Sequence, residues 1–454
     1  MTGTTDDLKR DLRHLILDLR QMKSFCQRPI IIDRSNGIHV YDIDGKRYID
    51  GISGIYVVNI GHGNQHVIEA IRRQQQRVNF VAPLHAVSDT AIRYARKLTE
   101  ITPEGMDTIK LLSGGSEATE SAIKFARQYH RQMGNPYKYK VIGNYTAFHG
   151  STMGAMSASG LGGPRKTKFG PFLEGFLHLP PPKTFRMDNG IDWSDLKTAA
   201  MLEQVIGHEG ADTIAAYIIE PISNTGGILT PSVEYFQRVR DICTKHNVLL
   251  IYDEIITGMG RTGEWFAAQT FGVTPDVLCI GKGLASGYAP LSAMVVRDGL
   301  YFDGFWGEPE ENIDFAHGHT FGANPISAAA GLAVIEVMEQ DGLIARGLEV
   351  GEHIRARLTR EVSKLDILSE VLGKGAWSGV AFVENMDTKQ PFPAERCFGK
   401  KVESRMLNKG LILRCDPDWI AFAPPLITTI EQADEMIDIF VDCLGDELRS
   451  GSSV

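Results

Sequence analysis

The sequence contains no uninterrupted run of eighteen apolar residues, so it predicts no membrane-spanning helix. It also lacks an excess of positive charge, because its formal net charge is -9 and both signs are spread along the chain. We therefore expect neither nucleic acid nor an anionic membrane as its main partner. Residues 1–22 lack the continuous apolar core of a signal peptide and are interpreted as an amphipathic helix.

Cysteine pairs are missing as well. The six cysteines are widely spaced and none forms a CxxC motif, which predicts reduced thiols in a cytoplasmic protein. His317 and His319 form an HGH pair without an evident third ligand, so we expect no metal site. The chain has no internal repeat and no low-complexity linker, and its 454 residues suffice to bury a large core in more than one domain.

The middle of the chain alternates short apolar stretches with longer helical ones. Because alternating strands and helices build parallel sheets covered on both faces, we expect an α/β fold here. The expected strands are 108–113, 140–145, 214–221, 248–254 and 277–282, and the expected helices include 116–133 and 232–247.

The two ends of the chain do not show this alternation of short apolar and longer helical stretches. Residues 38–61 alternate apolar and polar side chains around Asp44-Gly45, which is typical of a β-hairpin. Residues 163–185 are rich in glycine and proline and predict a long loop. We expect an N-terminal helix and hairpin in 1–60 that join a small C-terminal domain in 331–454, with a large cofactor-binding domain in 61–330 between them. The C-terminal elements expected are a helix over 327–342 and strands over 376–385, 410–415 and 419–426.

One lysine stands without a local partner. In PDVLCIGKGLASGYAPLSA (275–293), no arginine, aspartate or glutamate follows Asp276, and Lys282 lies between Gly281 and Gly283. A lysine with its ammonium group in water is one interpretation. The other is a catalytic amine that forms a Schiff base with a carbonyl group, with the glycines leaving room for a bulky adduct. This stretch alone leaves both interpretations open.

The turn after the first expected strand of the sheet suits an anion. In LLSGGSEATE, Gly115 and Ser116 open a helix, where backbone N–H groups can bind a phosphate. The alternative is ordinary capping, with Ser116 as N-cap and Glu120 in the first turn. The stretch is not the GxGxxG dinucleotide pattern.

Other expected strands also end in polar residues. Asp253 ends a buried strand and needs a partner, for which a protonated ring nitrogen, a structural ion pair and a metal are all candidates. Glu220 ends another strand, and Phe148-His149 lies in a turn where an aromatic ring could stack on a flat ligand. A phosphate cradle, a carboxylate, an aromatic face and a free lysine together are what pyridoxal 5'-phosphate requires.

These motifs also resemble a known family. DEIITGMGRTGEWFA followed by PDVLCIGKGLASGYAPLSA is similar to the signature of class III aminotransferases, and the resemblance extends from YDIDGKRYIDGISG to APPLIT. It implies the fold type I of pyridoxal-phosphate enzymes, an α/β fold. In that fold a large domain with a mostly parallel seven-stranded sheet is joined to a smaller α+β domain.

The resemblance assigns roles to individual residues. Lys282 matches the lysine that binds the cofactor as a Schiff base and then carries the proton, and Asp253 matches the carboxylate at the ring nitrogen. Ile255 and Phe148 match the residues on the two faces of the ring. Thr320 matches a threonine that reaches the phosphate of the neighbouring subunit, which implies a homodimer, with a tetramer as the alternative. The candidate cofactor-binding residues are thus Gly115, Ser116, Phe148, His149, Glu220, Asp253, Ile255, Lys282 and Thr320.

Two features bear on the substrate. Relatives that act on 4-aminobutyrate or ornithine carry a glutamate that gates a substrate-binding arginine, but Thr225 stands at that position here. Arg414 matches the mobile arginine of omega-amino acid:pyruvate aminotransferases, whose planar fork binds a carboxylate. Tyr56 matches an aromatic wall of their pocket. Arg414 as a surface ion pair and Tyr56 as core packing are the alternatives.

The resemblance therefore implies an aminotransferase. It would move an amino group from an amine or omega-amino acid to pyruvate or a similar oxo-acid, in two half-reactions through pyridoxamine phosphate. One alternative is another pyridoxal-phosphate reaction, that of a decarboxylating transaminase or an aminomutase. A second is a catalytically silent regulator that binds the cofactor, against which the intact Lys282 and Asp253 argue.

Overall fold

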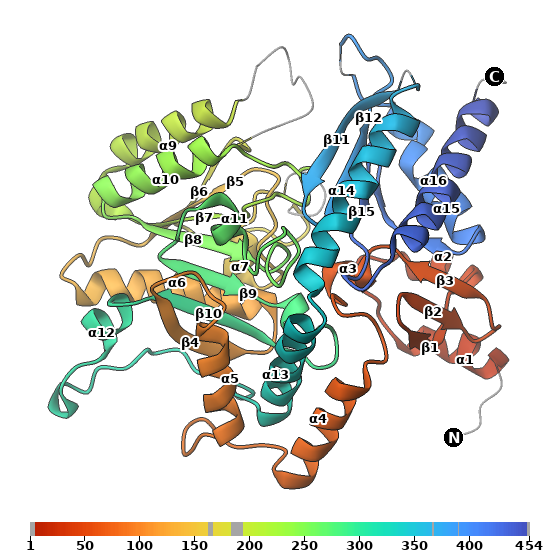
Figure 1. Cartoon of the computed structure of the whole chain (residues 1–454). Helices are drawn as coiled ribbons and strands as arrows, with labels where there is room; N and C mark the ends of the chain where they lie inside the picture. Colours follow the sequence, from red (N-terminus) through yellow and green to blue (C-terminus); the bar gives the residue numbers. More distant parts are fainter. Residues whose placement is uncertain (1–4, 162–166, 183–193, 366, 389, 452–454) are drawn as a thin grey trace.

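The computed structural model describes residues 5–161, 167–182, 194–365, 367–388 and 390–451, and its centre is a seven-stranded sheet (Figure 1). The strands of this sheet are β4 (Met106–Leu112), β5 (Lys140–Asn144), β6 (Phe176–Leu179), β7 (Ile214–Ile219), β8 (Leu249–Glu254), β9 (Val277–Ile280) and β10 (Ser292–Arg297). Their order is β4-β10-β9-β8-β7-β5-β6. Only β10 runs against the others, since it is antiparallel to both β4 and β9. The expected mostly parallel sheet is confirmed.

Both faces of this sheet are buried, because alternate side chains of each strand enter two different hydrophobic cores. Tyr217, Tyr252 and Ile280 belong to one core, whereas their strand neighbours Ile218 and Ile251 belong to the other. The first face is covered by α5 (Asp89–Thr99), α9 (Asp195–Glu209), α10 (Val233–Lys245) and α13 (Pro325–Gln340), and the second by α6 (Gly115–Gln132) and α12 (Leu300–Phe305). None of the helices in the described ranges is long and apolar enough to cross a membrane.

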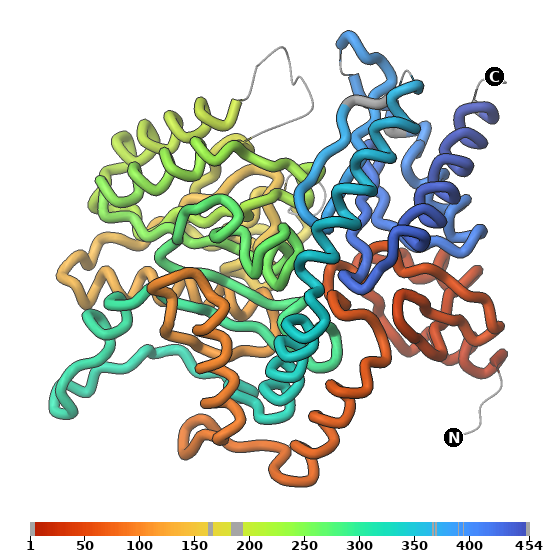
Figure 2. Tube along the Cα trace, in the orientation of Figure 1, coloured from red at the N-terminus to blue at the C-terminus, as the bar shows by residue number. Residues whose placement is uncertain are grey.

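The two ends of the chain lie together beside the large sheet, as the red and blue parts of the tube show (Figure 2). One four-stranded sheet has the order β1-β2-β3-β13, so three N-terminal strands pair with one from the C-terminal part; the other has the order β11-β12-β15-β14. Both contribute to a third core, which contains Ile49, Val380 and Phe440. Their strands are β1 (Ile32–Asn36), β2 (His39–Asp42), β3 (Arg47–Asp50), β11 (Leu368–Lys374), β12 (Trp377–Phe382), β13 (Leu411–Ile412), β14 (Arg414–Asp416) and β15 (Trp419–Phe422).

The remaining helices connect these sheets or cover them. Residues of α14, α15 and α16 enter the core of the two small sheets. The bounds are α2 (Met22–Gln27), α3 (Ser53–Tyr56), α4 (Gln65–Arg77), α7 (Met153–Ala158), α11 (Ala267–Phe271), α14 (Leu343–Val362), α15 (Phe398–Asn408) and α16 (Ile430–Gly451).

Most of the expected elements are confirmed to within two residues. The five expected strands of the middle region are β4, β5, β7, β8 and β9, and the expected helices are α6, α10 and α13. The hairpin around Asp44-Gly45 is formed by β2 and β3, and Gly45 has a φ of 85°, the left-handed conformation that favours glycine in such turns.

The helix expected over residues 1–22 is confirmed only in part. From residue 5, where the described part of the chain begins, α1 (Thr5–Asp11) and the short 3-10 helix η1 (Leu12–His14) form, but residues 15–21 are irregular. Leu15 and Ile16 remain 58% and 94% exposed. A short amphipathic segment depends on packing for its helicity, and these two side chains find no apolar face to pack on.

Three further expectations about secondary structure differ from the observed elements. The loop expected over 163–185 contains β6, although residues 162–166 and 183–193 lie outside the described part of the chain. The strand expected over 410–415 is two strands, because β13 pairs with β3 whereas β14 pairs with β15 in the other small sheet. The antiparallel β10 was not expected from the sequence, since the Lys282 stretch shows no strand-like alternation there.

A buried arginine joins the large sheet to both ends of the chain. Arg261, which follows β8, is completely buried. Its guanidinium group donates to Asn59 Oδ1 at 2.6 Å and to Ser53 Oγ at 3.3 Å, and also to the carbonyl oxygens of Pro424 at 2.7 Å and Ala376 at 3.4 Å. The N-terminal segment 53–59 is thereby held between the sheet and the C-terminal part.

Candidate active site

Titratable side chains lie at the carboxyl ends of three neighbouring parallel strands, at one edge of the large sheet. Glu220 directly follows β7, Asp253 lies at the end of β8, and Lys282 opens the 3-10 helix η3 (Lys282–Leu284) just after β9. Because the carboxyl ends of parallel strands meet at the same edge, this is where an open α/β sheet binds its ligand.

The amine of Lys282 faces a pocket and has no partner among the described residues. No hydrogen bond or ion pair links its Nζ to the described part of the chain. Burial lowers the pKa of this amine to about 8, and Arg414 acts in the same direction, whereas the nearby carboxylates of Asp253 and Glu220 raise it. With this pKa, a far larger fraction of the Lys282 amine is unprotonated near neutral pH than for an ordinary lysine, which favours its action as nucleophile and proton acceptor.

The two glycines beside Lys282 accommodate protein atoms. A Cβ at Gly283 would lie 2.5 Å from Asn59 Nδ2, and one at Gly281 would lie 3.0 Å from Ile255 Cδ1. Lys282 itself has a φ of 43°, which is unusual for a residue with a side chain. The glycines thus allow the close packing that holds this strained turn, rather than clearing space for a ligand as their spacing suggested.

Asp253 has a partner that the sequence did not reveal. Its Oδ2 lies 2.8 Å from His149 Nδ1, and its Oδ1 accepts a hydrogen bond from the Ile255 amide at 3.2 Å. Both Asp253 and His149 are almost fully buried. His149 Nε2 is also buried and has no hydrogen-bond partner among the described residues. His149 therefore supports the Asp253 carboxylate from behind and does not lie in the pocket wall.

Glu220 is a partly buried acid behind the aromatic residue of the pocket. It accepts a hydrogen bond from the backbone N–H of Phe148 at 3.2 Å. Burial raises the pKa of Glu220 to about 7, with a further upward effect of Asp253, although His149 lowers it. The side chain of Phe148 lines the pocket.

The N-terminus of α6 offers free donors close to this edge. Gly114 is the N-cap, and Glu117 accepts its N–H at 2.8 Å, so Ser116 is not the cap and Glu120 does not complete one. The Ser116 hydroxyl instead accepts the Ser151 N–H at 2.9 Å. Within the described residues, no acceptor takes the N–H groups of Gly115 and Ser116. Such donors at a helix N-terminus suit a phosphate group.

Ile255 lies between the turn of α6 and the turn of Lys282. A Cβ at Gly115 would meet its side chain at 3.1 Å, as one at Gly281 would at 3.0 Å. Gly115 is thus required for this close approach. The unmatched amides of Gly115 and Ser116, the carboxylate of Asp253, and the apolar surfaces of Ile255 and Phe148 fit a flat ring that carries a phosphate.

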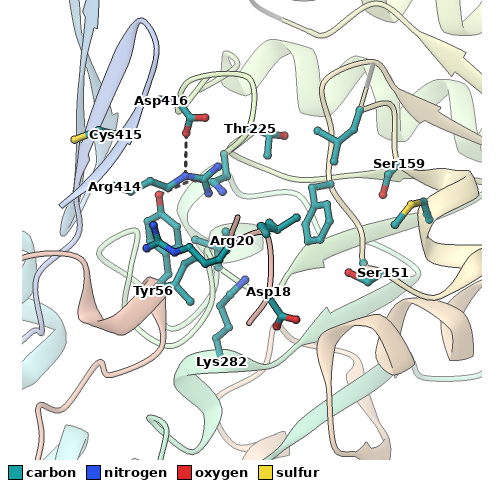
Figure 3. A pocket seen from close by; sticks show the side chains of 18 of the residues that line it. Asp18, Arg20, Tyr56, Ser151, Ser159, Thr225, Lys282, Arg414, Cys415 and Asp416 are labelled. Atoms are coloured by element: carbon teal, nitrogen blue, oxygen red, sulfur yellow. Dashed lines mark hydrogen bonds and ion pairs between the residues drawn. The ribbon is translucent and has the colours of Figure 1, made fainter. Parts of the chain in front are cut away.

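The pocket that Lys282 and Phe148 border has a volume of about 700 Å³, and Gly115, Ser116, Asp253 and Ile255 are not part of its lining (Figure 3). It is bordered by the large sheet, by the N-terminal segment and by the C-terminal part of the chain. Its lining residues include Asp18, Leu19, Arg20, Ile55, Tyr56, Phe148, Ser151, Ser159, Thr225, Lys282, Lys400, Glu403, Arg414 and Asp416.

Arg414 and Tyr56 form a connected wall opposite the sheet. Arg414 Nε donates to Asp416 Oδ2 at 3.1 Å, and its guanidinium group lies 5.0 Å from the ring centre of Trp419. It also donates to the Tyr56 hydroxyl, which in turn donates to Asn224 Oδ1 at 2.8 Å (Figure 3). Arg414 is therefore not a surface ion pair, and Tyr56 borders the pocket although its ring also packs against the core.

Of the remaining candidate residues, Thr225 lines the pocket and Thr320 does not. Thr225 lines it, and its hydroxyl donates to the Thr146 carbonyl oxygen, so the pocket contains no gating glutamate at this position. Thr320 is exposed and does not line the pocket of this chain. His319 contacts Glu117 at 3.0 Å, and the described ranges contain no group of three potential metal ligands.

Several pocket residues escaped the sequence analysis. Asp18, Leu19 and Arg20 were assigned to a helix, and nothing in the local pattern indicates that they reach the pocket. Asp416 could have been found, because residues two apart on a strand share a face and it lies two positions after Arg414. Asn224 gave no signal, since its contact with Tyr56 joins distant segments.

The comparison with known proteins agrees with this geometry. A family model described as aminotransferase class-III matches residues 22–444. The chain belongs to the class-III aminotransferases.

The relatives of this aminotransferase match it over most of their length. It is 38% identical to an uncharacterised aminotransferase of Bacillus subtilis, covering 88% of this chain and 89% of the relative. It is 34% identical to the taurine–pyruvate aminotransferase of Bilophila wadsworthia, with 94% of each covered. An (S)-enantioselective omega-transaminase from Thermomicrobium roseum has a similar structure, with a TM-score of 0.91, 34% identity, and coverage of 99% of this chain and 100% of that one. The fold is that of the fold type I transaminases.

The lowered pKa of Lys282 gives a pH-dependent prediction for the cofactor-free aminotransferase. An amine that loses its proton near pH 8 becomes reactive well below the pH of about 10 that an ordinary lysine needs. Acetylation of Lys282 by acetic anhydride, followed by peptide mapping, should therefore reach half its maximal rate near pH 8. In Asp253→Asn the midpoint should fall further, because the charge that favours the ammonium form is removed. A midpoint near pH 10, like that of exposed lysines in the same digest, would contradict the assignment.

Proposed function

We propose that the chain transfers an amino group from an amine or omega-amino acid to pyruvate or a similar oxo-acid, with pyridoxal 5'-phosphate as its cofactor. The observation that carries this proposal is the amine of Lys282, which has no partner among the described residues and lies at the shared end of three parallel strands, near Asp253 and facing the pocket. The pyruvate-dependent activity named for the Bilophila wadsworthia relative supports the choice of acceptor.

Different residues would bind different parts of the cofactor. Gly115 and Ser116 would bind the phosphate through their free N–H groups. Asp253, oriented by His149, would hold a proton on the ring nitrogen. Phe148 and Ile255 would lie on the two faces of the ring. When bound, this cofactor supplies the carbonyl carbon that takes up the amine and a ring that accepts an electron pair from the substrate carbon.

Lys282 would provide the covalent attachment and then the proton transfer. Its Nζ, neutral from about pH 8 upward, can accept the proton from the substrate carbon and return it to the cofactor side. The phenyl ring of Phe148 and the Tyr56–Arg414 wall would exclude water from the amine. Arg414 would orient the substrate through its carboxylate.

The cofactor site can be tested directly at Lys282. Treatment of the holoenzyme with borohydride should fix the cofactor to the chain, and peptide mapping should locate it at Lys282. Lys282→Ala should retain no covalent cofactor and no transamination. As a matched control, Lys110→Ala, which changes a half-buried lysine of β4, should keep both. Cofactor fixed to any other lysine would refute the proposal, and so would deamination that continues over many turnovers without a carbonyl acceptor.

Arg414 gives a prediction that separates the two half-reactions. Loss of a charge-assisted, two-pronged contact costs about 2–3 kcal/mol, or roughly thirtyfold to 150-fold. Arg414→Ala should slow the half-reaction with pyruvate by this factor but leave the half-reaction with a donor that lacks a carboxylate almost unchanged. Single-turnover absorbance of the cofactor measures each half separately.

Tyr56→Phe is the control for the Arg414 measurement. It keeps the ring in the wall but removes the hydroxyl group to which Arg414 donates. Its effect should be smaller than that of Arg414→Ala and confined to the pyruvate half-reaction. Equal losses in both halves for Arg414→Ala would show that Arg414 only maintains the pocket.

We further propose that the chain acts as a homodimer whose partner supplies Thr320 to the phosphate. In support, Thr320 is exposed and does not belong to the pocket lining of its own chain. Nearby in space, Phe80 and Phe321 have ring centres 6.0 Å apart, and both are partly exposed. Leu84, four residues after Phe80, is 90% exposed. An apolar patch of this kind is typical of a contact surface.

The dimer is tested by its mass. Sedimentation equilibrium should give twice the mass of one chain. Leu84→Asp should shift the equilibrium toward the monomer and weaken cofactor binding in parallel, because the phosphate loses Thr320. Leu196→Asp, at a 40% exposed position on α9, should change neither. A fully active monomer would contradict the shared site.

A further inference from the structure

The Glu117 carboxylate shares the N-terminal end of α6 with the proposed phosphate site. Glu117 lies in the first turn of this helix, and its Oε2 accepts the N–H groups of Gly114 at 2.8 Å and Ser113 at 3.2 Å. The next two N–H groups, those of Gly115 and Ser116, have no acceptor among the described residues. Because the N-terminal end of a helix attracts any nearby anion, a carboxylate and a phosphate in this turn are drawn to the same donors.

His319 contacts the same carboxylate from a segment that is distant in the sequence. Its Nε2 lies 3.0 Å from Glu117 Oε2, the oxygen that also accepts the two backbone N–H groups. Two acceptors would repel each other at this distance, so the Nε2 atom of His319 carries a proton. The imidazole is only 14% exposed, and no described residue forms a hydrogen bond with its Nδ1. Within the described part of the chain, the ring of His319 therefore makes its close polar contact with Glu117.

The backbone around His319 is packed against the strand that leads into α6. The Gly322 N–H donates to the His319 carbonyl oxygen at 3.0 Å. A Cβ at Gly322 would lie 3.1 Å from this oxygen and 3.3 Å from the carbonyl oxygen of Leu111 in β4. The absence of a side chain at Gly322 thus allows this close approach. The position of the His319 ring at Glu117 is therefore set by closely packed backbone.

We propose that His319 is a positioning residue for the phosphate group of the cofactor. This inference rests on the proposed function, in which the N–H groups of Gly115 and Ser116 bind that phosphate. His319 holds the Glu117 carboxylate on the two N–H groups that precede the helix, and its own N–H offsets part of the negative charge there. Without this contact, the carboxylate would repel the phosphate more strongly and would be free to turn toward the same two donors.

A contact that only supports the fold would behave differently. Thr320, the proposed contact to the phosphate of the neighbouring subunit, directly follows His319. If the contact with Glu117 served only to hold this segment, its loss would weaken cofactor binding whether or not residue 117 carries a charge. In the proposed role, the loss depends on that charge and on the phosphate. These two dependences separate the two roles.

Cofactor affinity tests the role of His319, because it is measured without turnover. The dissociation constants of pyridoxal 5'-phosphate and of pyridoxal, which lacks the phosphate, are obtained from absorbance titrations of the full-length, cofactor-free chain. His319→Phe fills the same space without a ring nitrogen, and His319→Ala is the second variant. Both should weaken the binding of pyridoxal 5'-phosphate about three- to tenfold, the range of a partly exposed ion pair acting on a group with nearly two charges. The binding of pyridoxal should not change.

Glu117→Gln provides the comparison that isolates the charge. It keeps an oxygen for the two backbone N–H groups but removes the negative charge, so by itself it should not weaken the binding of pyridoxal 5'-phosphate. Adding His319→Phe or His319→Ala to Glu117→Gln should then cause no further loss. As matched controls, His66→Phe and His66→Ala remove a 2.6 Å contact with Glu336 between α4 and α13. These controls should leave both dissociation constants unchanged.

The inference is overturned by any of four results. These are unchanged binding of pyridoxal 5'-phosphate in a folded His319 variant, an equal loss for pyridoxal, a loss that persists in the Glu117→Gln background, and a similar loss in the His66 variants. A wild-type chain that binds pyridoxal 5'-phosphate at Lys282 but shows one of these results refutes only the role of His319. If the wild-type chain binds neither compound, the proposed function fails, and the inference fails with it.

Discussion

The geometry of the pocket depends on a buried guanidinium group that forms no ion pair with a carboxylate in the described part of the chain. Arg261 donates to the oxygens of Asn59 and Ser53 and to two carbonyl groups of the C-terminal part, while Asp50 favours its charged form without bonding to it. Each acceptor would cost about 1–3 kcal/mol if it were left buried without a donor. The segment 53–59 therefore cannot leave the sheet without breaking several contacts at once. That segment has positive φ angles at Ser53 (51°) and Tyr56 (65°), and the surrounding contacts hold this strain where Tyr56 borders the pocket.

Burial has opposite consequences for the two kinds of titratable group at the sheet edge. It disfavours the charged form in each case, so it lowers the pKa of Lys282 and raises that of Glu220. Asp253 is more deeply buried than Lys282 and Glu220, and His149 and the Ile255 amide supply hydrogen bonds to its two oxygens. The amine is thus available as a base, while the carboxylate beside it has the partners that an ionised acid requires. The difference arises from the immediate neighbours, because all three groups occupy the same edge of one sheet.

The sequence predicted the parts of the fold in which local pattern and tertiary structure agree. Strands such as β7 and β8 are apolar throughout and end in a polar residue, so both their position and their contribution to the site could be inferred. His149 could not be assigned to Asp253, because the two are 104 positions apart and join only when β5 and β8 lie in one sheet. The division of 410–415 into β13 and β14 was not predicted for a related reason. Where each strand ends depends on the distant strand with which it pairs. Residues 15–21 were misjudged because an amphipathic pattern does not specify whether a partner surface exists.

The candidate catalytic and substrate-reading residues come from different layers of the molecule. Lys282 and Asp253 lie on buried strand ends, where a change of volume or charge disturbs two hydrophobic cores. Tyr56 and Arg414 come from the terminal parts of the chain, as does the exposed turn with Asp18 and Arg20 that borders the pocket. Substitutions in the exposed turn alter few packed contacts, whereas Tyr56 is almost completely buried and packs against the Trp377 ring, with ring centres 5.1 Å apart. Changes at Tyr56 or Arg414 must therefore preserve the packing of the small sheets, whereas Lys282 and Asp253 keep the positions that the large sheet gives them.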